Sequence, residues 1–200
     1  MFIQVITGTV TDAEGLKRQF DRWQTELRPG ATGYLGSTAG ITADGRVVVL
    51  ARFDTEADAR RNSERPEQAK WWAETEKMLR DAAFDDSVEV KTMLGGGSDI
   101  AAFVQVMRGH VKDAGKLAAL EAAMGKSEAG MRRFRPDILG EVIAIHAGGT
   151  YTDAVYFTSE SEAHAGETTP PPAELQTVID DMDAAIAVDE YLDLTAPWLH

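Results

Sequence analysis

The sequence contains no cysteine and only four histidines. The absence of cysteine excludes disulfide bonds, thiolate nucleophiles and cysteine-ligated zinc or iron–sulfur centres. The histidines are His110, His146, His164 and His200, which are scattered and lack the i, i+4 spacing of paired ligands on a helix. The sequence therefore predicts no metal site.

Basic residues are also scarce, with 20 Lys and Arg against 33 Asp and Glu and a net charge of −13. Such a surface repels phosphate backbones, so we expect no nucleic-acid partner. No apolar run approaches the roughly 18–20 residues of a membrane span, and the N-terminus begins a strand without a basic leader. These features predict a cytoplasmic protein with no membrane partner.

The most informative feature that is present is an internal duplication. The stretch from Phe2 to Ala13 returns from Phe103 to Ala114 with identical Phe, Gln, Val, Gly, Val, Asp and Ala. The match continues downstream, where the segment beginning at Phe53 returns at Phe157. A self-match over most of a chain indicates two copies of one structural unit. We divide the chain into a first repeat at 1–94, a glycine-rich linker at 95–100 and a second repeat at 101–200.

Alternation, capping and turn signals predict the same element order in both repeats. In the first repeat we expect strand 2–10, a helix from Asp12 to Arg28, strands 33–42 and 46–53, a helix from 55, a helix at about 67–83 and strand 87–90. In the second repeat we expect strand 102–111, helix 113–124, strands 138–146 and 150–158, helices 159–165 and 173–187, and strand 190–195. The tail at 197–200 has no assignment.

This order is βαββαβ, the ferredoxin-like arrangement. A four-stranded sheet with helices on one face leaves its other face bare, and two such sheets can cover each other. We therefore expect an α+β protein of two tandem ferredoxin-like repeats whose sheets pack as an intramolecular α+β barrel. A fused chain of this kind can do alone what a single repeat does as a homodimer. The chain is then either a monomeric pseudo-dimer or a homodimer.

The duplicated unit resembles the dimeric α/β-barrel superfamily, and most closely its antibiotic biosynthesis monooxygenase-like branch. The likeness between residues is strongest from Phe53 to Trp72, a stretch similar to the one with which many members begin their second helix. The superfamily includes cofactor-free oxygenases of polycyclic phenols, haem-degrading and haem-binding enzymes, isomerases and proteins without known activity. The fold by itself does not select among these reactions.

The resemblance implies roles for two residues. In cofactor-free oxygenases of this family, an Asn and a Trp near the pocket hold a phenolate substrate, which points here to Asn62 and Trp71. An electron-rich phenolate carbanion can itself pass an electron to O2, so the protein needs only to deprotonate, desolvate and orient it. Haem-degrading relatives rely on a histidine after the tryptophan, and the segment from Trp72 to Met78 has none. We therefore expect no cofactor.

Comparison of the repeats places the predicted pocket in the first one. Trp71, Trp72, Asn62 and Arg52 align with Leu175, Gln176, Gly166 and Tyr156. Only the first repeat keeps large aromatic and polar groups together, and its predicted binding residues are Trp71, Trp72, Asn62, Tyr34 and Arg52. The alternative is that Trp71 is a packing residue, because the positions aligned with its helix form an apolar stripe in the second repeat.

Two hypotheses of function follow. The first is a cofactor-independent oxygenase acting on an aromatic or polycyclic small molecule bound in the first repeat. The second is a non-catalytic small-molecule-binding or structural protein whose pocket is filled by its own side chains.

Overall fold

The chain forms two compact units. The computed structural model describes the backbone of residues 1–200 and all side chains except those of residues 121, 122 and 124. Unit 1 consists of Met1–Val90 together with Ala196–His200, and unit 2 consists of Lys91–Thr195. The last five residues, which the sequence division assigns to the second repeat, thus belong to the first unit.

Unit 1 has the order strand, helix, two strands, two helices, strand, and it gains a short strand from the C-terminal tail. Its elements are β1 (Phe2–Val10), α1 (Ala13–Arg22), a π-helical turn η1 (Trp23–Leu27), a 3-10 turn η2 (Arg28–Gly30), β2 (Tyr34–Ile41), β3 (Arg46–Phe53), α2 (Glu56–Ser63), α3 (Pro66–Thr75), η3 (Glu76–Met78), β4 (Leu79–Met93) and β9 (Trp198–Leu199). The end of β4 from Lys91 onward belongs to unit 2.

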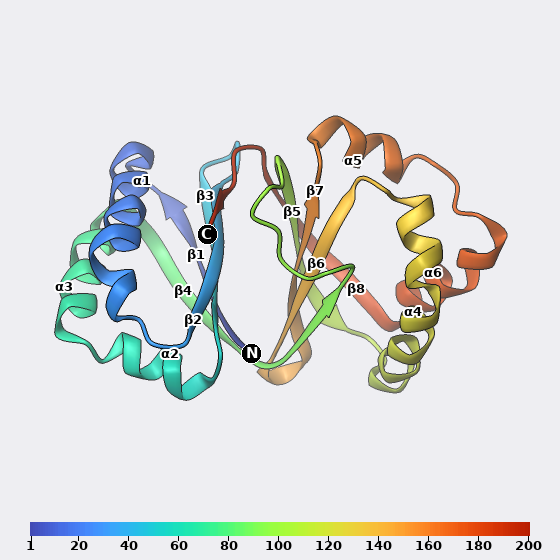
Figure 1. Ribbon diagram of the computed structural model, residues 1–200, viewed down its shortest axis with the longest axis horizontal. Helices are drawn as coiled ribbons and strands as arrows, with labels where there is room; N and C mark the ends of the chain where they lie inside the picture. The colour runs from blue at the N-terminus through green and yellow to red at the C-terminus, as the bar shows by residue number, and fades with distance from the viewer. The chain divides into compact units, whose positions relative to one another are not determined.

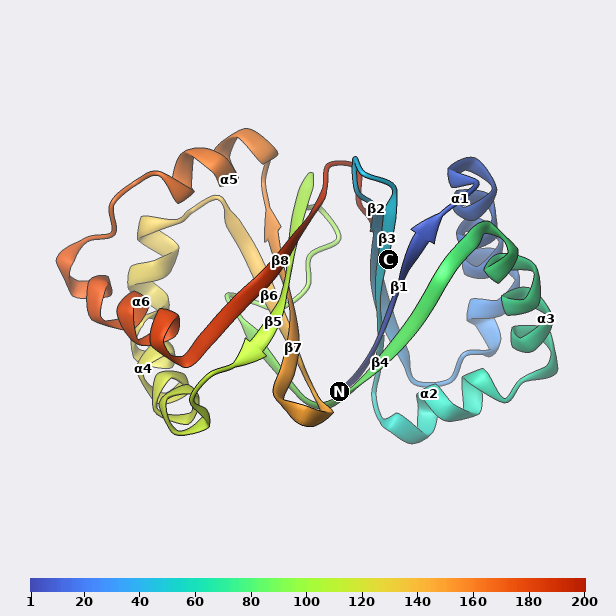
Figure 2. The same cartoon turned by 180° about the vertical axis from the view of Figure 1, so that it is seen from behind.

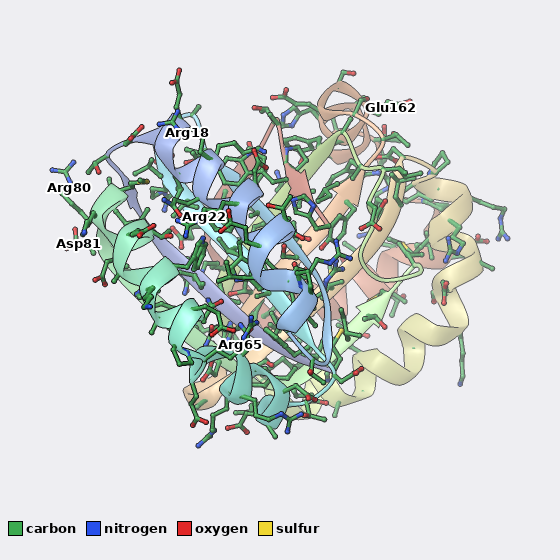
Figure 3. All side chains as sticks on the ribbon, turned by 60° about the vertical axis from the view of Figure 1, so that its left-hand side comes forward. Arg18, Arg22, Arg65, Arg80, Asp81 and Glu162 are labelled. Carbon is green, nitrogen blue, oxygen red and sulfur yellow. The ribbon has the colours of Figure 1, made fainter. Side chains whose placement is uncertain are left out.

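Local sequence signals explain where the helices of unit 1 begin. The side chain of Asp12 accepts a hydrogen bond from the backbone N–H of Gly15 (2.8 Å), which caps α1. Pro66 occupies the first turn of α3, where its missing N–H costs nothing and where it prevents α2 from continuing. Arg22 lies on α1 (Figure 3) and forms an ion pair with Glu74 of α3 (Nη1 to Oε2, 2.6 Å), which joins these two helices.

The sheet of unit 1 is antiparallel, with the strand order β4-β1-β3-β2-β9, and its helices lie on one face (Figure 1). The tail forms its edge, where Leu199 pairs with Thr38 and Trp198 with Ala39. Figure 2 shows the C-terminus beside β2 and β3. Gly36 permits this approach, because a Cβ at that position would overlap the carbonyl group of His200.

Unit 2 repeats the βαββαβ order. Its elements are β5 (Phe103–Val111), α4 (Ala114–Phe134), β6 (Ile138–His146), a turn η4 (Ala147–Gly149), β7 (Thr150–Phe157), α5 (Glu160–Glu167), α6 (Ala173–Ala185) and β8 (Ile186–Leu194). Its strands are ordered β8-β5-β7-β6, and β4 follows next to β6. Gly140 of β6 corresponds to Gly36, and a Cβ there would overlap the carbonyl group of Gly96. The first strand of each hairpin, β2 or β6, is therefore approached by the segment that follows the last strand of the other repeat.

The doubled ferredoxin-like α+β fold predicted from the sequence is confirmed, whereas several helix ends are wrong. The helix expected at about 67–83 ends at Thr75, and β4 begins at Leu79, opposite Val10 of β1. The helix expected at 173–187 likewise ends at Ala185, and Ile186 begins β8. The helix expected at 113–124 continues to Phe134. Among the residues that the structure describes, no helix is long and apolar enough to cross a membrane.

Candidate functional site

A cavity of about 350 Å³ lies in unit 2, on the face of the sheet that α4 and α6 cover. Its volume is at the lower end of the range of small-molecule pockets in proteins. The apolar part of its wall includes Leu117, Leu120, Ile143, Ile145, Met182 and Ile186. The polar part consists of Lys91, Thr92, Glu128, Glu141, Tyr151 and Asp153. An apolar cavity with a few polar groups is the usual form of a site for an organic molecule.

The hairpin of β6 and β7 places the polar groups on the cavity side. Alternate residues of a strand point to the same face, and Ile143 pairs directly with Asp153. Glu141 and Tyr151, each two residues away along its own strand, therefore share that face. The result is two carboxyl groups and one phenol on a wall that is otherwise lined by isoleucine.

The two carboxyl groups form a hydrogen-bonded pair. Asp153 is 5% exposed, and its Oδ1 is sealed from solvent. Burial raises the pKa of Asp153 well above its ordinary value, and the nearby charge of Glu141 raises it further. Burial also raises the pKa of Glu141. Two carboxylates this close cannot both ionise at low cost, so the pair retains a shared proton to a higher pH than an isolated acid would.

Tyr151 sits beside this pair as a neutral hydrogen-bond donor. Burial, followed by the charge of Asp153, raises the pKa of its phenol group. Its hydroxyl group donates a hydrogen bond to the backbone carbonyl of Ala187 (3.2 Å). Because ionisation of Tyr151 is disfavoured, the acid–base chemistry available in this wall belongs to the carboxyl pair.

Unit 1 has none of these groups at the corresponding positions. Glu141, Tyr151 and Asp153 lie 104 residues after Ser37, Val47 and Val49, and the two hairpins share the same register. In unit 1 both valines belong to a packed cluster with Ile6, Leu16 and Ala39. Phe20, Trp72, Met78 and Trp198 are among the partly buried residues that pack against this cluster. The corresponding region of unit 1 holds only a cavity of about 60 Å³, whose wall includes Ser37 and Val49.

The tryptophans singled out from the sequence lie in an aromatic cluster of unit 1. Trp71 is 4% exposed, and its indole N–H donates to the carbonyl of Gln19 (2.9 Å). Its ring meets those of Phe20 and Trp23 at centroid distances of 5.8 and 6.5 Å. Trp72 is half-buried and stacks edge-on against Phe84 at 4.9 Å. These contacts support packing as one role of Trp71.

The other three predicted residues each have partners within unit 1. Asn62 accepts a hydrogen bond from Arg65 (2.9 Å), and the hydroxyl of Tyr34 donates to Ser37 (2.7 Å). Arg52 donates to the carbonyl oxygen of His200 (3.2 Å). Trp71, Asn62 and Tyr34 share the wall of a cavity of about 60 Å³, whereas Trp72 and Arg52 are not part of that wall. This space suits one or two water molecules, since each takes about 30 Å³ in the liquid.

Sequence reasoning missed the carboxyl pair, although a signal was present. Glu141 and Asp153 interrupt the apolar side of two adjoining strands, at positions where the first repeat has Ser37 and Val49. The alignment of the repeats was used for Trp71, Trp72, Asn62 and Arg52, and the same alignment applied to the acids would have found the pair. Among the residues that the structure describes, no group of three or more His, Asp or Glu is arranged to hold a metal ion.

The fold places the chain among proteins with a doubled ferredoxin-like unit, and solved structures with this fold resemble it over its full length. A candidate monooxygenase from Lactobacillus acidophilus is 12% identical with a TM-score of 0.69, over 100% of this chain and 98% of its own. A candidate monooxygenase from Fusobacterium nucleatum is 10% identical with a TM-score of 0.71, over 100% of this chain and 93% of its own. An anthrone oxidase-like protein is 13% identical with a TM-score of 0.67, over 100% and 91%.

Neither a protein-family model nor a curated protein matches the sequence. At 10–13% identity, the structural likeness shows a shared fold and not a shared reaction. The resemblance to antibiotic biosynthesis monooxygenase-like proteins seen in the sequence is thus confirmed at the level of the fold. The reaction must be argued from the residues of this chain.

Proposed function

We propose that this protein binds an aromatic small molecule in the cavity of unit 2 and acts on it as a cofactor-independent oxygenase. The observation that carries the proposal is the contrast between the two units. One hairpin lines an apolar cavity of about 350 Å³ with a carboxyl pair, while the matching hairpin of unit 1 borders a cavity of about 60 Å³ and carries no acid there. An apolar cavity that contains a proton acceptor suits a flat, weakly acidic substrate.

The chemistry needs little from the protein. Once a polycyclic phenol or anthrone loses a proton, its electron-rich anion can pass an electron to O2 without a metal. The cavity would supply a base, exclude water and hold the ring system in one orientation. The similarity in fold to an anthrone oxidase-like protein makes anthrone a suitable first substrate. Its oxidation to anthraquinone consumes one O2 and releases water.

We would test the proposal by measuring oxygen uptake with anthrone, after subtracting the uptake in protein-free buffer. Ile143→Trp should fill the cavity and reduce the protein-dependent rate at least about tenfold, because the ring system could no longer enter. Ile100→Trp is the matched control. Ile100 is 82% exposed and is not part of the cavity wall, so this variant should retain the rate. Equal rates in both variants would contradict a reaction in this cavity.

The binding residues predicted in unit 1 stay a second proposal that the same preparation can test. All four tryptophans belong to unit 1, because the tail brings Trp198 into it. A ligand in contact with Trp71 should quench tryptophan fluorescence, and the quenching should weaken in a Trp71→Phe variant. Saturable binding in either unit without oxygen uptake would favour the non-catalytic alternative. The chain is predicted to be either a monomeric pseudo-dimer or a homodimer, and sedimentation analysis would distinguish the two.

A further inference from the structure

The wall of the large cavity in unit 2 has a counterpart in unit 1. The alignment of the repeats and the strand pairing match its residues Val111, Leu117, Ile143, Ile145, Tyr151, Asp153, Met182 and Ile186 with Val10, Leu16, Ala39, Ile41, Val47, Val49, Met78 and Leu79. All of these unit 1 residues belong to one apolar cluster or pack against it. Unit 1 therefore keeps the wall, and other side chains occupy the space that the wall encloses in unit 2.

One of these side chains comes from the tail, Ala196–His200. The indole of Trp198 packs against the apolar cluster, and its ring centroid lies 5.3 Å from that of Phe20. The ammonium group of Lys17 lies 5.5 Å from the indole, which is the distance of a cation–π contact. In unit 2 the segment after β4 supplies the residues at 91–93 to the cavity wall, and none of them is aromatic. The tail thus fills space in unit 1 that stays open in unit 2.

We propose that the tail is a displaceable plug, and that its departure opens a second binding site in unit 1 for an uncharged ring of the size of indole. The cluster residues that form the wall of this site carry no ionisable group, so the site binds a ligand without acid–base chemistry. An apolar wall disfavours a charged ligand, and Lys17 favours an electron-rich ring. The inference is independent of the oxygenase activity proposed for unit 2, because it uses neither the cavity nor the carboxyl pair of that unit.

A small number of contacts hold the tail on unit 1. Its strand β9 has two residues, and the backbones of Ser37 and His200 exchange two hydrogen bonds beside it. Arg52 donates a further hydrogen bond to the carbonyl oxygen of His200 (3.2 Å). Thr195 and Ala196, which connect the tail to β8, are exposed. Short edge segments open at a lower free energy than the core of a domain, so the tail can leave while the rest of unit 1 stays folded.

The wall of the site has support that does not come from the tail. Phe20 packs edge-on against Trp71 at a centroid distance of 5.8 Å, and the ion pair between Arg22 and Glu74 joins α1 to α3. These contacts keep the two helices in place when the indole leaves. An apolar cavity without polar partners stays free of water and binds small aromatic molecules. The opened site therefore suits indole itself, which has the shape of the side chain that it replaces.

Hydrogen exchange of the unaltered chain tests whether the tail leaves. The backbone N–H of Ser37 donates to the carbonyl oxygen of His200 (2.8 Å), so its protection reports the position of the tail. Leu50 lies in β3, which pairs with β1 and β2, so its N–H reports the unfolding of the whole sheet. We expect Ser37 to exchange at least about 100-fold faster than Leu50, because local opening needs less free energy than global unfolding.

A disulfide latch tests whether the ligand enters only when the tail leaves. Thr38 and Leu199 are direct partners next to the hydrogen-bonded pair of Ser37 and His200, so their Cα atoms have the close spacing that a disulfide requires. The sequence has no cysteine, so Thr38→Cys/Leu199→Cys can form one defined bond. Ile143→Trp in the same chain fills the cavity of unit 2. Calorimetric titration should show that the oxidised chain binds indole at least about tenfold more weakly than the reduced chain, because its binding-competent state is depopulated.

Removal of the indole side chain should leave the site open. Trp198→Ala keeps the chain at full length and should bind indole at least about tenfold more tightly than its parent, because the ligand no longer competes with the plug. Tyr191→Ala is the matched control, since Tyr191 is 56% exposed on β8 and its loss should leave the affinity for indole unchanged. Both variants are compared in the Ile143→Trp background. If that background folds poorly, the same comparison without it is still valid, since the cavity of unit 2 is then equal in all chains.

Each outcome bears on a defined part of the inference. Exchange at Ser37 that is as slow as exchange at Leu50 would overturn a displaceable tail. Equal binding of indole by the oxidised and reduced latch, or by the Trp198→Ala and Tyr191→Ala variants, would overturn the second site. Neither result changes the oxygen uptake expected from unit 2, and a failure of that uptake would leave this inference in place.

Discussion

At the scale of single residues, the decisive feature is a pair of acids at positions that are apolar or small in the other repeat. Asp153 and Val49 occupy the same register position, yet one is a buried acid and the other is packed core. A buried acid pair usually costs a protein stability, because well-packed apolar residues of similar size at the same positions often make the fold more stable. The pair is therefore better explained by a role in the cavity than by a role in the fold.

This cost predicts that the acids can be replaced with a gain in stability. The double variant Glu141→Ser/Asp153→Val carries the residues of unit 1, and we expect its free energy of unfolding at neutral pH to rise by about 1–4 kcal/mol. The reverse change, Val49→Asp, buries an unpaired acid in the core of unit 1 and should lower it by about 3 kcal/mol or more. Urea denaturation measures both. A loss of stability in the double variant would contradict a functional origin of the pair.

At the scale of elements, the edges of both sheets depend on segments that come from the other repeat. Gly36 and Gly140 hold the same position in β2 and β6, and each meets a backbone carbonyl where a Cβ would stand. Gly36 has a φ of +141°, a backbone conformation that residues other than glycine rarely adopt. In unit 1 this contact is with the tail. The backbone N–H of Ser37 donates a hydrogen bond to the carbonyl oxygen of His200 (2.8 Å), and the backbone N–H of His200 donates one to the carbonyl oxygen of Ser37 (3.0 Å).

We expect that a single methyl group added at Gly36 displaces the tail. Gly36→Ala should lower the free energy of unfolding by about 1–3 kcal/mol and should speed hydrogen exchange at the backbone N–H of Ser37, because the tail must shift. Gly125→Ala is the matched control, since a Cβ there meets no atom within 4 Å and the position is helical. It should be neutral or stabilising by up to about 1 kcal/mol. Equal exchange at Ser37 in both variants would contradict a tail held by this contact.

At the scale of the whole molecule, the buried acids make stability depend on pH in an unusual direction. The ordinary pKa values are 3.8 for Asp153 and 4.5 for Glu141, and both are raised in the folded chain. Above these ordinary values the unfolded chain releases protons that the folded chain retains. The contribution of the pair is therefore fully present below about pH 4 and is lost as the pH rises through the raised values.

We expect the double variant Glu141→Ser/Asp153→Val to differ most from the unaltered chain above the ordinary pKa values of the two acids. The difference in free energy of unfolding should grow with pH, by up to about 1.4 kcal/mol per pH unit for each retained proton. Exposed acids with a lowered pKa, such as Asp44 and Glu162, act in the opposite direction, but both proteins contain them. Denaturation series from pH 4 to pH 8 would measure this difference, and a constant difference would contradict the raised values.

Much of this architecture could be predicted from the sequence, because duplication, alternation and capping are local signals. Asp12 and Pro66 mark helix starts by their own chemistry, and the repeat doubles every such observation. The error at 79–83 has a physical cause. Leu79, Ala82 and Ala83 continue a helical stripe and favour helix, but β1 offers them a partner that is about 70 residues away in the sequence. Pairing with a distant strand overrides local preference, and no short window contains it.

The sequence by itself determined the doubled βαββαβ order, because each element carries its periodicity and its turn residues with it. Only the tertiary structure decided which repeat contains the large cavity. Packing density depends on how side chains from several elements meet, and the same hairpin borders a cavity of about 60 Å³ in unit 1 and one of about 350 Å³ in unit 2. It also decided that Trp198 belongs to unit 1, since a tail finds its sheet through backbone hydrogen bonds that the sequence does not encode.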